Sequence, residues 1–78
     1  MNESSLLADL NALMSSVLGI IVTEETVRKT EPAWDSLKHM EIIFAVEGKW
    51  GVTFSEEEIV LIGSVADLLR KLQTHNAS

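Results

Sequence analysis

Apolar residues recur at helical spacing near the start of this 78-residue chain. The spacing of three to four residues that lines one face of a helix runs from Leu6 to Leu18, and Gly19 follows where a left-handed residue commonly ends a helix. The residues of this stripe are Leu6, Leu10, Leu13 and Val17, with Leu7, Met14 and Leu18 beside them. The pattern predicts a first helix over Leu6–Leu18.

A second helix is predicted from Asp35 to about Trp50. The carboxylate of Asp35 can accept hydrogen bonds from the free N–H groups of the first turn, and its negative charge suits the positive end of a helix. Gly51 ends the pattern. This segment therefore has a start signal and a stop signal of its own.

The segment between these two helices, residues 20–34, mixes β-branched and charged residues. It contains Pro32, which pushes Glu31 toward an extended conformation. We predict a long ordered loop with one turn of helix, because its apolar residues can pin it to the core. Those residues are Ile20, Ile21, Val22, Val27 and Trp34.

Two capping patterns mark two further helix starts. Ser55 followed by Glu58 is a capping box, and Ser64 followed by Asp67 is a weaker version of it. They predict a short helix over about Glu56–Ile62 and a fourth helix with the stripe Val65, Leu68, Leu69 and Leu72. Residues 74–78, with His75 among them, are expected to fray.

The predicted fold class is all-α. No segment alternates with a period of two, and no internal repeat or low-complexity tract is present. The chain is therefore expected to form one domain over residues 1–78, a small four-helix bundle of three longer helices and a short third helix. A long loop separates its first and second helices.

Composition narrows the classes of function. Twelve acidic against six basic residues give a net charge of −6, which opposes binding to nucleic acid or to an anionic membrane. With no cysteine and no histidine pair at metal-ligand spacing, neither disulfides nor structural zinc can support the fold. No apolar run approaches the ~18 residues of a membrane span, and the start of the chain lacks the basic region of a signal peptide. We expect a cytoplasmic protein without membrane insertion whose partners carry basic patches.

The predicted second helix carries more apolar surface than one core needs. At about 100° per residue its apolar side chains span roughly 220°, against the ~100° stripe of an ordinary surface helix. One group, expected to pack against the first and fourth helices, is Ile42, Ile43, Val46 and Trp50. The other group is Leu37, Met40 and Phe44, which begins beside Ser36 and is flanked by Asp35, Glu41 and Glu47. Apolar residues within an acidic rim indicate a docking face; burial against the third helix or the loop is the alternative.

Ser36 is the candidate attachment site. It is predicted to lie in the first turn of the second helix, directly after the cap Asp35, where its hydroxyl can face solvent. A phosphodiester at that position is favoured by the free N–H groups and the positive end of the helix dipole. Serine is also a common first-turn residue without further role, and from position alone that interpretation stays open.

The residues around Ser36 carry a family resemblance. Asp35-Ser36-Leu37 is followed by Met40-Glu41-Ile42-Ile43-Phe44-Ala45-Val46-Glu47, then by Trp50-Gly51-Val52 and Phe54. In this order and spacing, the segment from about Trp34 to Leu72 resembles the acyl carrier protein family and its peptidyl carrier relatives. The resemblance implies that Ser36 bears a covalent 4'-phosphopantetheine, transferred from coenzyme A by a magnesium-dependent phosphopantetheinyl transferase. The thiol of that arm holds the acyl group as a thioester.

The same resemblance implies further site residues. The face read by partner enzymes corresponds to Asp35, Leu37, Met40, Glu41, Phe44 and Glu47. By the same analogy, an acyl pocket between the second and third helices is lined by Ile43, Val46, Phe54, Ile59 and Ile62. The implied partners are acyl-transferring, condensing or adenylating enzymes, and the chain itself is expected to be a non-catalytic monomer.

Several positions depart from the bulk fatty-acid carriers. Lys38, His39, Gly48 and Lys49 make the second helix less acidic than is usual there, and Phe54-Ser55-Glu56 replaces the commoner Ile-Pro-Asp or Ile-Pro-Glu before the third helix. These departures favour a stand-alone carrier of a specialised pathway, such as polyketide, nonribosomal peptide or modified-lipid synthesis.

Other functions compete with the carrier interpretation. An unmodified acidic interaction module would use the face of Leu37, Met40 and Phe44 alone. A hydrolase using Ser36 would need a Gly-x-Ser-x-Gly elbow and a partner histidine and acid, which the sequence lacks. His39 is expected to cover Trp34 or the loop rather than to act in catalysis.

Overall fold

The chain folds into four α-helices. The computed structural model describes residues 3–76, with α1 (Glu3–Leu18), α2 (Ser36–Trp50), α3 (Glu56–Leu61), α4 (Val65–Asn76) and a short 3-10 helix, η1 (Arg28–Thr30). Across residues 3–76 no β-strand forms, although Val27 and Ser64 make an isolated antiparallel bridge. The predicted all-α class, with a short third helix and a helical turn in the long loop, is confirmed.

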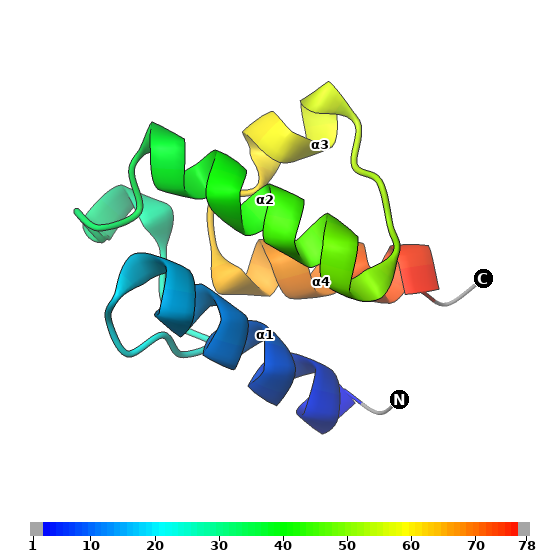
Figure 1. Cartoon of the computed structure of the whole chain (residues 1–78), viewed down its shortest axis with the longest axis horizontal. Helices are drawn as coiled ribbons and strands as arrows, with labels where there is room; N and C mark the ends of the chain where they lie inside the picture. The colour runs from blue at the N-terminus through cyan, green and yellow to red at the C-terminus, as the bar shows by residue number, and fades with distance from the viewer. Residues whose placement is uncertain (1–2, 77–78) are drawn as a thin grey trace.

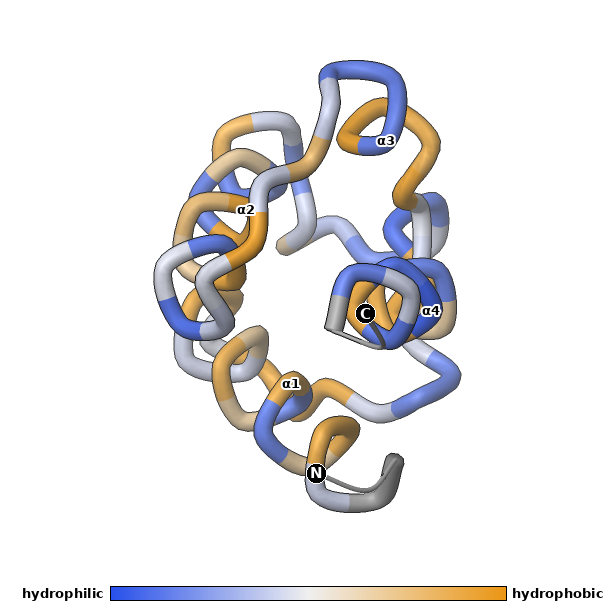
Figure 2. The backbone as a smooth tube through the Cα atoms, turned by 90° about the vertical axis from the view of Figure 1, so that its right-hand side faces the viewer, coloured by the Kyte–Doolittle hydropathy of each residue, from blue (hydrophilic) through white to orange (hydrophobic). Residues whose placement is uncertain are grey.

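The helices enclose one apolar interior. Helix α1 packs against both α2 and α4, and α3 lies at the far side of α2 and α4 from α1 (Figures 1 and 2). The Cα radius of gyration is 11.3 Å, close to the ~11.5 Å expected of a compact chain of this length. The three long helices therefore share a single small core, and α3 packs against it through the partly buried Ile59.

The ends of α2 follow the predicted signals. The Asp35 carboxylate accepts a hydrogen bond from the Lys38 backbone N–H at 2.9 Å, so Asp35 is the N-cap and the helix begins at Ser36. At the other end Gly51 takes the left-handed conformation with φ of 65°. Gly19 ends α1 in the same way, with φ of 72°.

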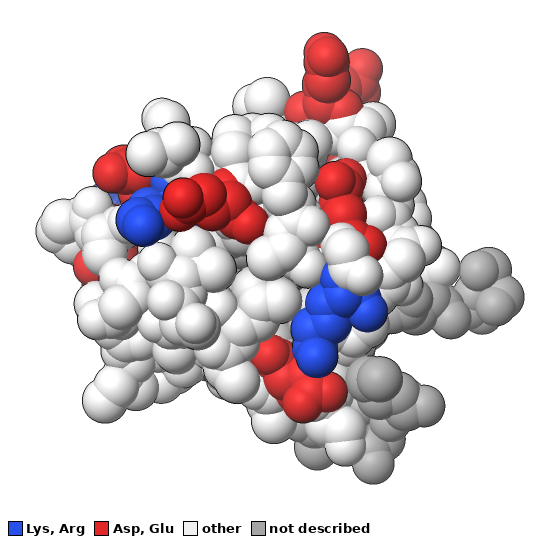
Figure 3. Space-filling view, viewed as in Figure 1, with Lys and Arg blue, Asp and Glu red and all other residues white. Residues whose placement is uncertain are grey.

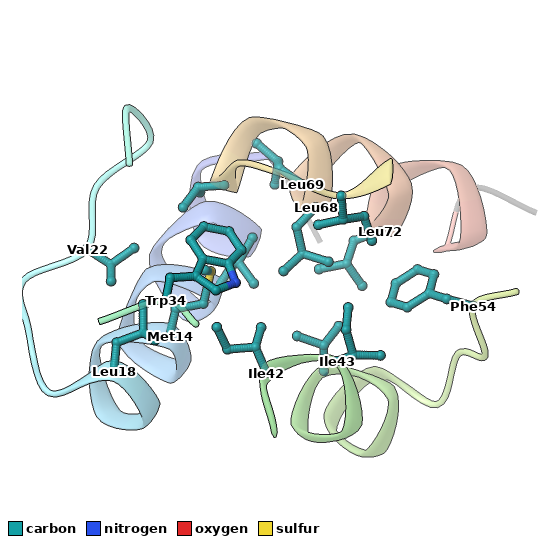
Figure 4. Packing of buried hydrophobic residues seen from close by; sticks show 14 of the residues in the cluster. Met14, Leu18, Val22, Trp34, Ile42, Ile43, Phe54, Leu68, Leu69 and Leu72 are labelled. Carbon is teal, nitrogen blue, oxygen red and sulfur yellow. The ribbon is translucent and has the colours of Figure 1, made fainter. Parts of the chain in front are cut away.

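The core contains fifteen buried apolar residues, contributed by α1, α2, α4 and the connecting segments. In Figure 4, Ile42 and Ile43 of α2 point toward Leu68 and Leu72 of α4. Trp34 is buried among them, while Trp50 is half-buried at the edge. The predicted core side of α2 is thus confirmed.

The long loop is held by three of its five predicted apolar residues and by backbone pairing, since Ile20 packs partly buried against the core. Val22 and Trp34 are buried, but Ile21 is 89% exposed and Val27 is also exposed. The prediction that Ile21 and Val27 pin the loop to the core is therefore wrong. Instead the backbone around Val27 is hydrogen-bonded to the turn before α4, through the bridge to Ser64.

The C-terminal part of α4 is more ordered than predicted. The helix continues to Asn76, and the Thr74 hydroxyl donates to the Arg70 carbonyl at 3.0 Å. His75 lies edge-on to Phe54, with 5.1 Å between ring centroids, and its Nε2 is 3.1 Å from the Glu58 carboxylate. The prediction of fraying is wrong for residues 74–76, which continue α4, and His75 is held by contacts to distant residues. Residues 77–78 lie outside the described part of the chain.

Candidate functional site

Ser36 is exposed at the first residue of α2. Its Oγ accepts a hydrogen bond from Nη2 of Arg28 at 3.2 Å, across the bend between η1 and α2. Asp35 caps the same turn with its carboxylate. The structure thus combines an accessible hydroxyl, a helix N-terminus and a guanidinium group, which together suit a phosphate attached to this oxygen.

Helix α2 presents two chemically different faces. Ile42, Ile43 and Val46 are fully buried, whereas Leu37 is 69% and Phe44 63% exposed. Met40, between the exposed pair on the helix, is half-buried. Helix α2 therefore has a core face and an exposed apolar face, as the wide apolar arc predicted. The alternative, in which Leu37 and Phe44 are buried, is wrong.

Charged groups border this exposed face. Asp35 and Glu41 are exposed, and Glu41 pairs with Lys38 at 3.2 Å on the surface of α2. Figure 3 shows acidic and basic groups separated by uncharged surface over α2. An exposed ion pair of this kind contributes little to stability, so these charges remain able to exchange partners.

Glu47 has an internal partner. It is only partly exposed, and its Oε2 accepts a hydrogen bond from the Phe54 backbone N–H at 2.9 Å. This bond ties the end of α2 to the segment that leads into α3. Glu47 therefore lies on the predicted partner side of α2 but has a structural role as well.

The five residues of the predicted acyl pocket belong to the core. Ile43, Val46, Phe54 and Ile62 are buried, and Ile59 is partly buried against them. A separate shallow hollow on α3 is lined by other residues, Glu56, Glu57, Val60 and Leu61. The structure brings the five predicted residues into one apolar cluster, and their role in holding an acyl chain stays a prediction.

His39 forms a buried link between three segments. The Trp34 indole N–H donates to His39 Nδ1 at 2.9 Å, and His39 Nε2 lies 2.8 Å from the Ile59 carbonyl oxygen. Because Nδ1 accepts, we assign the proton to Nε2, which donates to Ile59. His39 covers Trp34 as predicted. Its bond to α3 was not predicted, because sequence patterns do not identify a backbone carbonyl as a partner.

Glu58 joins the start of α3 to the end of α4. Its carboxylate accepts from the Ser55 backbone N–H at 2.9 Å and lies 3.1 Å from His75 Nε2 and 3.6 Å from Lys71 Nζ. The hydrogen bond from Ser55, with smaller contributions from His75 and Lys71, lowers the pKa of Glu58 to about 2. The predicted capping box of Ser55 and Glu58 is confirmed, since Ser55 Oγ also accepts from the Glu58 N–H.

This cluster predicts a specific acid sensitivity. Because the folded pKa of Glu58 lies below its unfolded value, near 4.5, the ionised carboxylate stabilises the fold above that value and loses its effect as the pH falls toward 2. Urea unfolding at pH 6 is expected to show Glu58→Gln as less stable than the wild type. The difference should shrink steadily between pH 4.5 and pH 2; a difference independent of pH would contradict the assignment.

No group of three or more His, Asp or Glu side chains among the described residues is arranged to hold a metal ion. No described helix has the length and apolar character to cross a membrane. No protein-family model matches the chain. What the fold and site define is a small helical bundle with an exposed serine at the start of its second helix.

Proposed function

We propose that this chain is an acyl carrier protein, which holds acyl intermediates as thioesters on a 4'-phosphopantetheine attached to Ser36. It presents them to enzymes of fatty acid, polyketide or related specialised biosynthesis and catalyses no reaction itself. The observation that carries the proposal is the exposed Ser36 hydroxyl at the N-terminus of α2, beside Arg28 and at the edge of an exposed apolar face. The resemblance of the segment from Trp34 to Leu72 supports the identity of the attached group.

The residues around Ser36 fit such a group. Asp35 caps the first turn and keeps the hydroxyl at the surface, while Arg28 places a positive charge beside the oxygen that would bear the phosphate. When attached, the group supplies a terminal thiol, and the chain has no cysteine of its own. A phosphopantetheinyl transferase is required to move the group from coenzyme A, with release of adenosine 3',5'-bisphosphate.

The exposed face of α2 suits the docking of partner enzymes. Leu37 and Phe44 offer apolar contact, and the exposed carboxylates of Asp35 and Glu41 lie near them. Interfaces commonly combine an apolar centre with a polar rim, and complementary charge steers association. The fitting partners are a phosphopantetheinyl transferase and acyl-transferring, condensing or adenylating enzymes with basic rims. A cytoplasmic monomer is the form that could visit each of them.

A second function is favoured by the same face. Leu37 and Phe44 are exposed in the unmodified chain, so an interaction module without any modification would also use them. A peptidyl carrier of nonribosomal peptide synthesis would share the modification and differ in receiving its cargo from an adenylating enzyme. Transfer of phosphopantetheine to the purified chain, and its loss in Ser36→Ala, separates both carriers from the interaction module.

A further inference from the structure

Arg28 differs from the other basic residues in its surroundings. Three of the six basic side chains form ion pairs, namely Lys38 with Glu41, Arg70 with Asp67 and Lys71 with Glu58. Among the side chains that the structure describes, those of residues 5–75, no carboxylate lies at ion-pair distance from Arg28. Its Nη2 instead donates to the Ser36 hydroxyl at 3.2 Å. The chain has twice as many acidic as basic residues, yet this guanidinium contacts a neutral hydroxyl oxygen.

The backbone of Arg28 is fixed independently of α2. Its N–H donates to the Gly63 carbonyl at 2.9 Å, and Val27 before it bridges to Ser64. The Val65 N–H donates in turn to the Thr26 carbonyl at 3.1 Å. Arg28 is therefore anchored to the turn before α4, and its side chain extends from there to the start of α2.

Two carboxylates between Arg28 and Lys38, those of Glu31 and Asp35, are engaged with backbone groups. Asp35 accepts from the Lys38 N–H, and Glu31 accepts from the Ala33 N–H at 3.1 Å. The adjacent Asp35 carboxylate would repel a phosphate on Ser36, so a positive charge beside the oxygen offsets that repulsion. A guanidinium remains charged at all ordinary pH and can donate two parallel hydrogen bonds to a phosphate.

We propose that Arg28 is the positioning residue for a phosphate attached to Ser36. Its guanidinium pairs with the phosphate oxygens and directs the root of the attached arm toward η1. The chemical identity of the arm rests on the proposed carrier function. The pairing itself depends on Arg28 and Ser36 alone and is testable without any transferase.

Phosphoserine at position 36, introduced into the full chain through an expanded genetic code, is the probe. A ³¹P NMR titration measures the second pKa of its phosphate, which is ordinarily about 6. A paired guanidinium lowers this pKa because it favours the doubly charged form. We expect Arg28→Gln to raise the pKa by about half a unit or more, and Arg28→Lys to restore part of the lowering.

Lys29→Gln is the matched control, because it removes the same charge from the adjacent, exposed residue. It is expected to change the phosphate pKa much less than Arg28→Gln does, with circular dichroism showing each variant folded. Equal pKa values in Arg28→Gln and the parent would overturn the proposal. So would equal shifts from the two variants, since a general charge effect would then explain both.

The proposed carrier function is tested by a different measurement from the one that tests Arg28. Phosphopantetheine transfer to the unmodified chain reports on that function, whereas the phosphoserine pKa reports on Arg28. If Arg28 lowers the pKa but no transferase modifies Ser36, the pairing stands and the carrier function falls. If Ser36 is modified and Arg28→Gln leaves the phosphoserine pKa unchanged, the carrier function stands and the pairing falls.

Discussion

Replacing Ile43 by alanine is expected to lower the free energy of unfolding by about 2–5 kcal/mol. Ile43 is fully buried on α2 and points toward Leu72 of α4 (Figure 4). The substitution removes apolar contact and leaves a cavity in a core that is small to begin with. A chain of this length has a total stability of about 4–12 kcal/mol, so urea unfolding followed by circular dichroism should show a large shift of the midpoint.

The next residue along the helix is the matched control. Phe44 is 63% exposed, so Phe44→Ala is expected to change the free energy of unfolding by no more than about 0.5 kcal/mol. If the exposed face docks the transferase, the same substitution slows transfer to Ser36 although the fold is intact. Similar destabilisation by the two substitutions would contradict the two-faced description of α2.

Replacing His39 by alanine is expected to cost about 1–3 kcal/mol of stability or more. The substitution leaves the buried Trp34 indole N–H without its partner, and it also removes the partner of the Ile59 carbonyl, which is only partly buried and adds less. Urea unfolding measures the loss. Tryptophan fluorescence should change as well, because the environment of Trp34 is altered.

Glutamine at the same position tests whether hydrogen bonding is the cause. In His39→Gln the side-chain oxygen can accept from Trp34 and the amide can donate to Ile59, so a smaller loss than in His39→Ala is expected. If His39→Ala unfolds at the same urea concentration as the wild type, the bonds through His39 do not hold α3 to α2.

Local signals predicted the elements of the fold well. These signals involve contacts between residues only a few positions apart. They are the cap Asp35, the glycines at positions 19 and 51, and the capping box of Ser55 and Glu58. Their geometry depends little on the rest of the chain. The exposed face of α2 was also predictable, because its apolar arc is too wide for one core.

Contacts between distant segments were not predictable in this way. Three such contacts join elements whose relative placement the sequence pattern does not specify. They are His75 with Glu58, Glu47 with the Phe54 backbone, and His39 with the Ile59 carbonyl. The pairing of the backbone around Val27 with the turn before α4 was not predictable either, because it joins segments that are far apart in the sequence. Arg28 reaches Ser36 across an eight-residue separation that only the folded loop brings together.

The mass of the intact protein, before and after incubation with coenzyme A, magnesium and a broad-specificity phosphopantetheinyl transferase, tests the carrier proposal most directly. We predict a gain of one phosphopantetheine in the wild type and in the control Ser55→Ala, and no gain in Ser36→Ala. Circular dichroism establishes that each variant is folded, and a known carrier in parallel establishes that the transferase is active. No gain in the folded wild type, or a gain that persists in Ser36→Ala, would contradict the proposal.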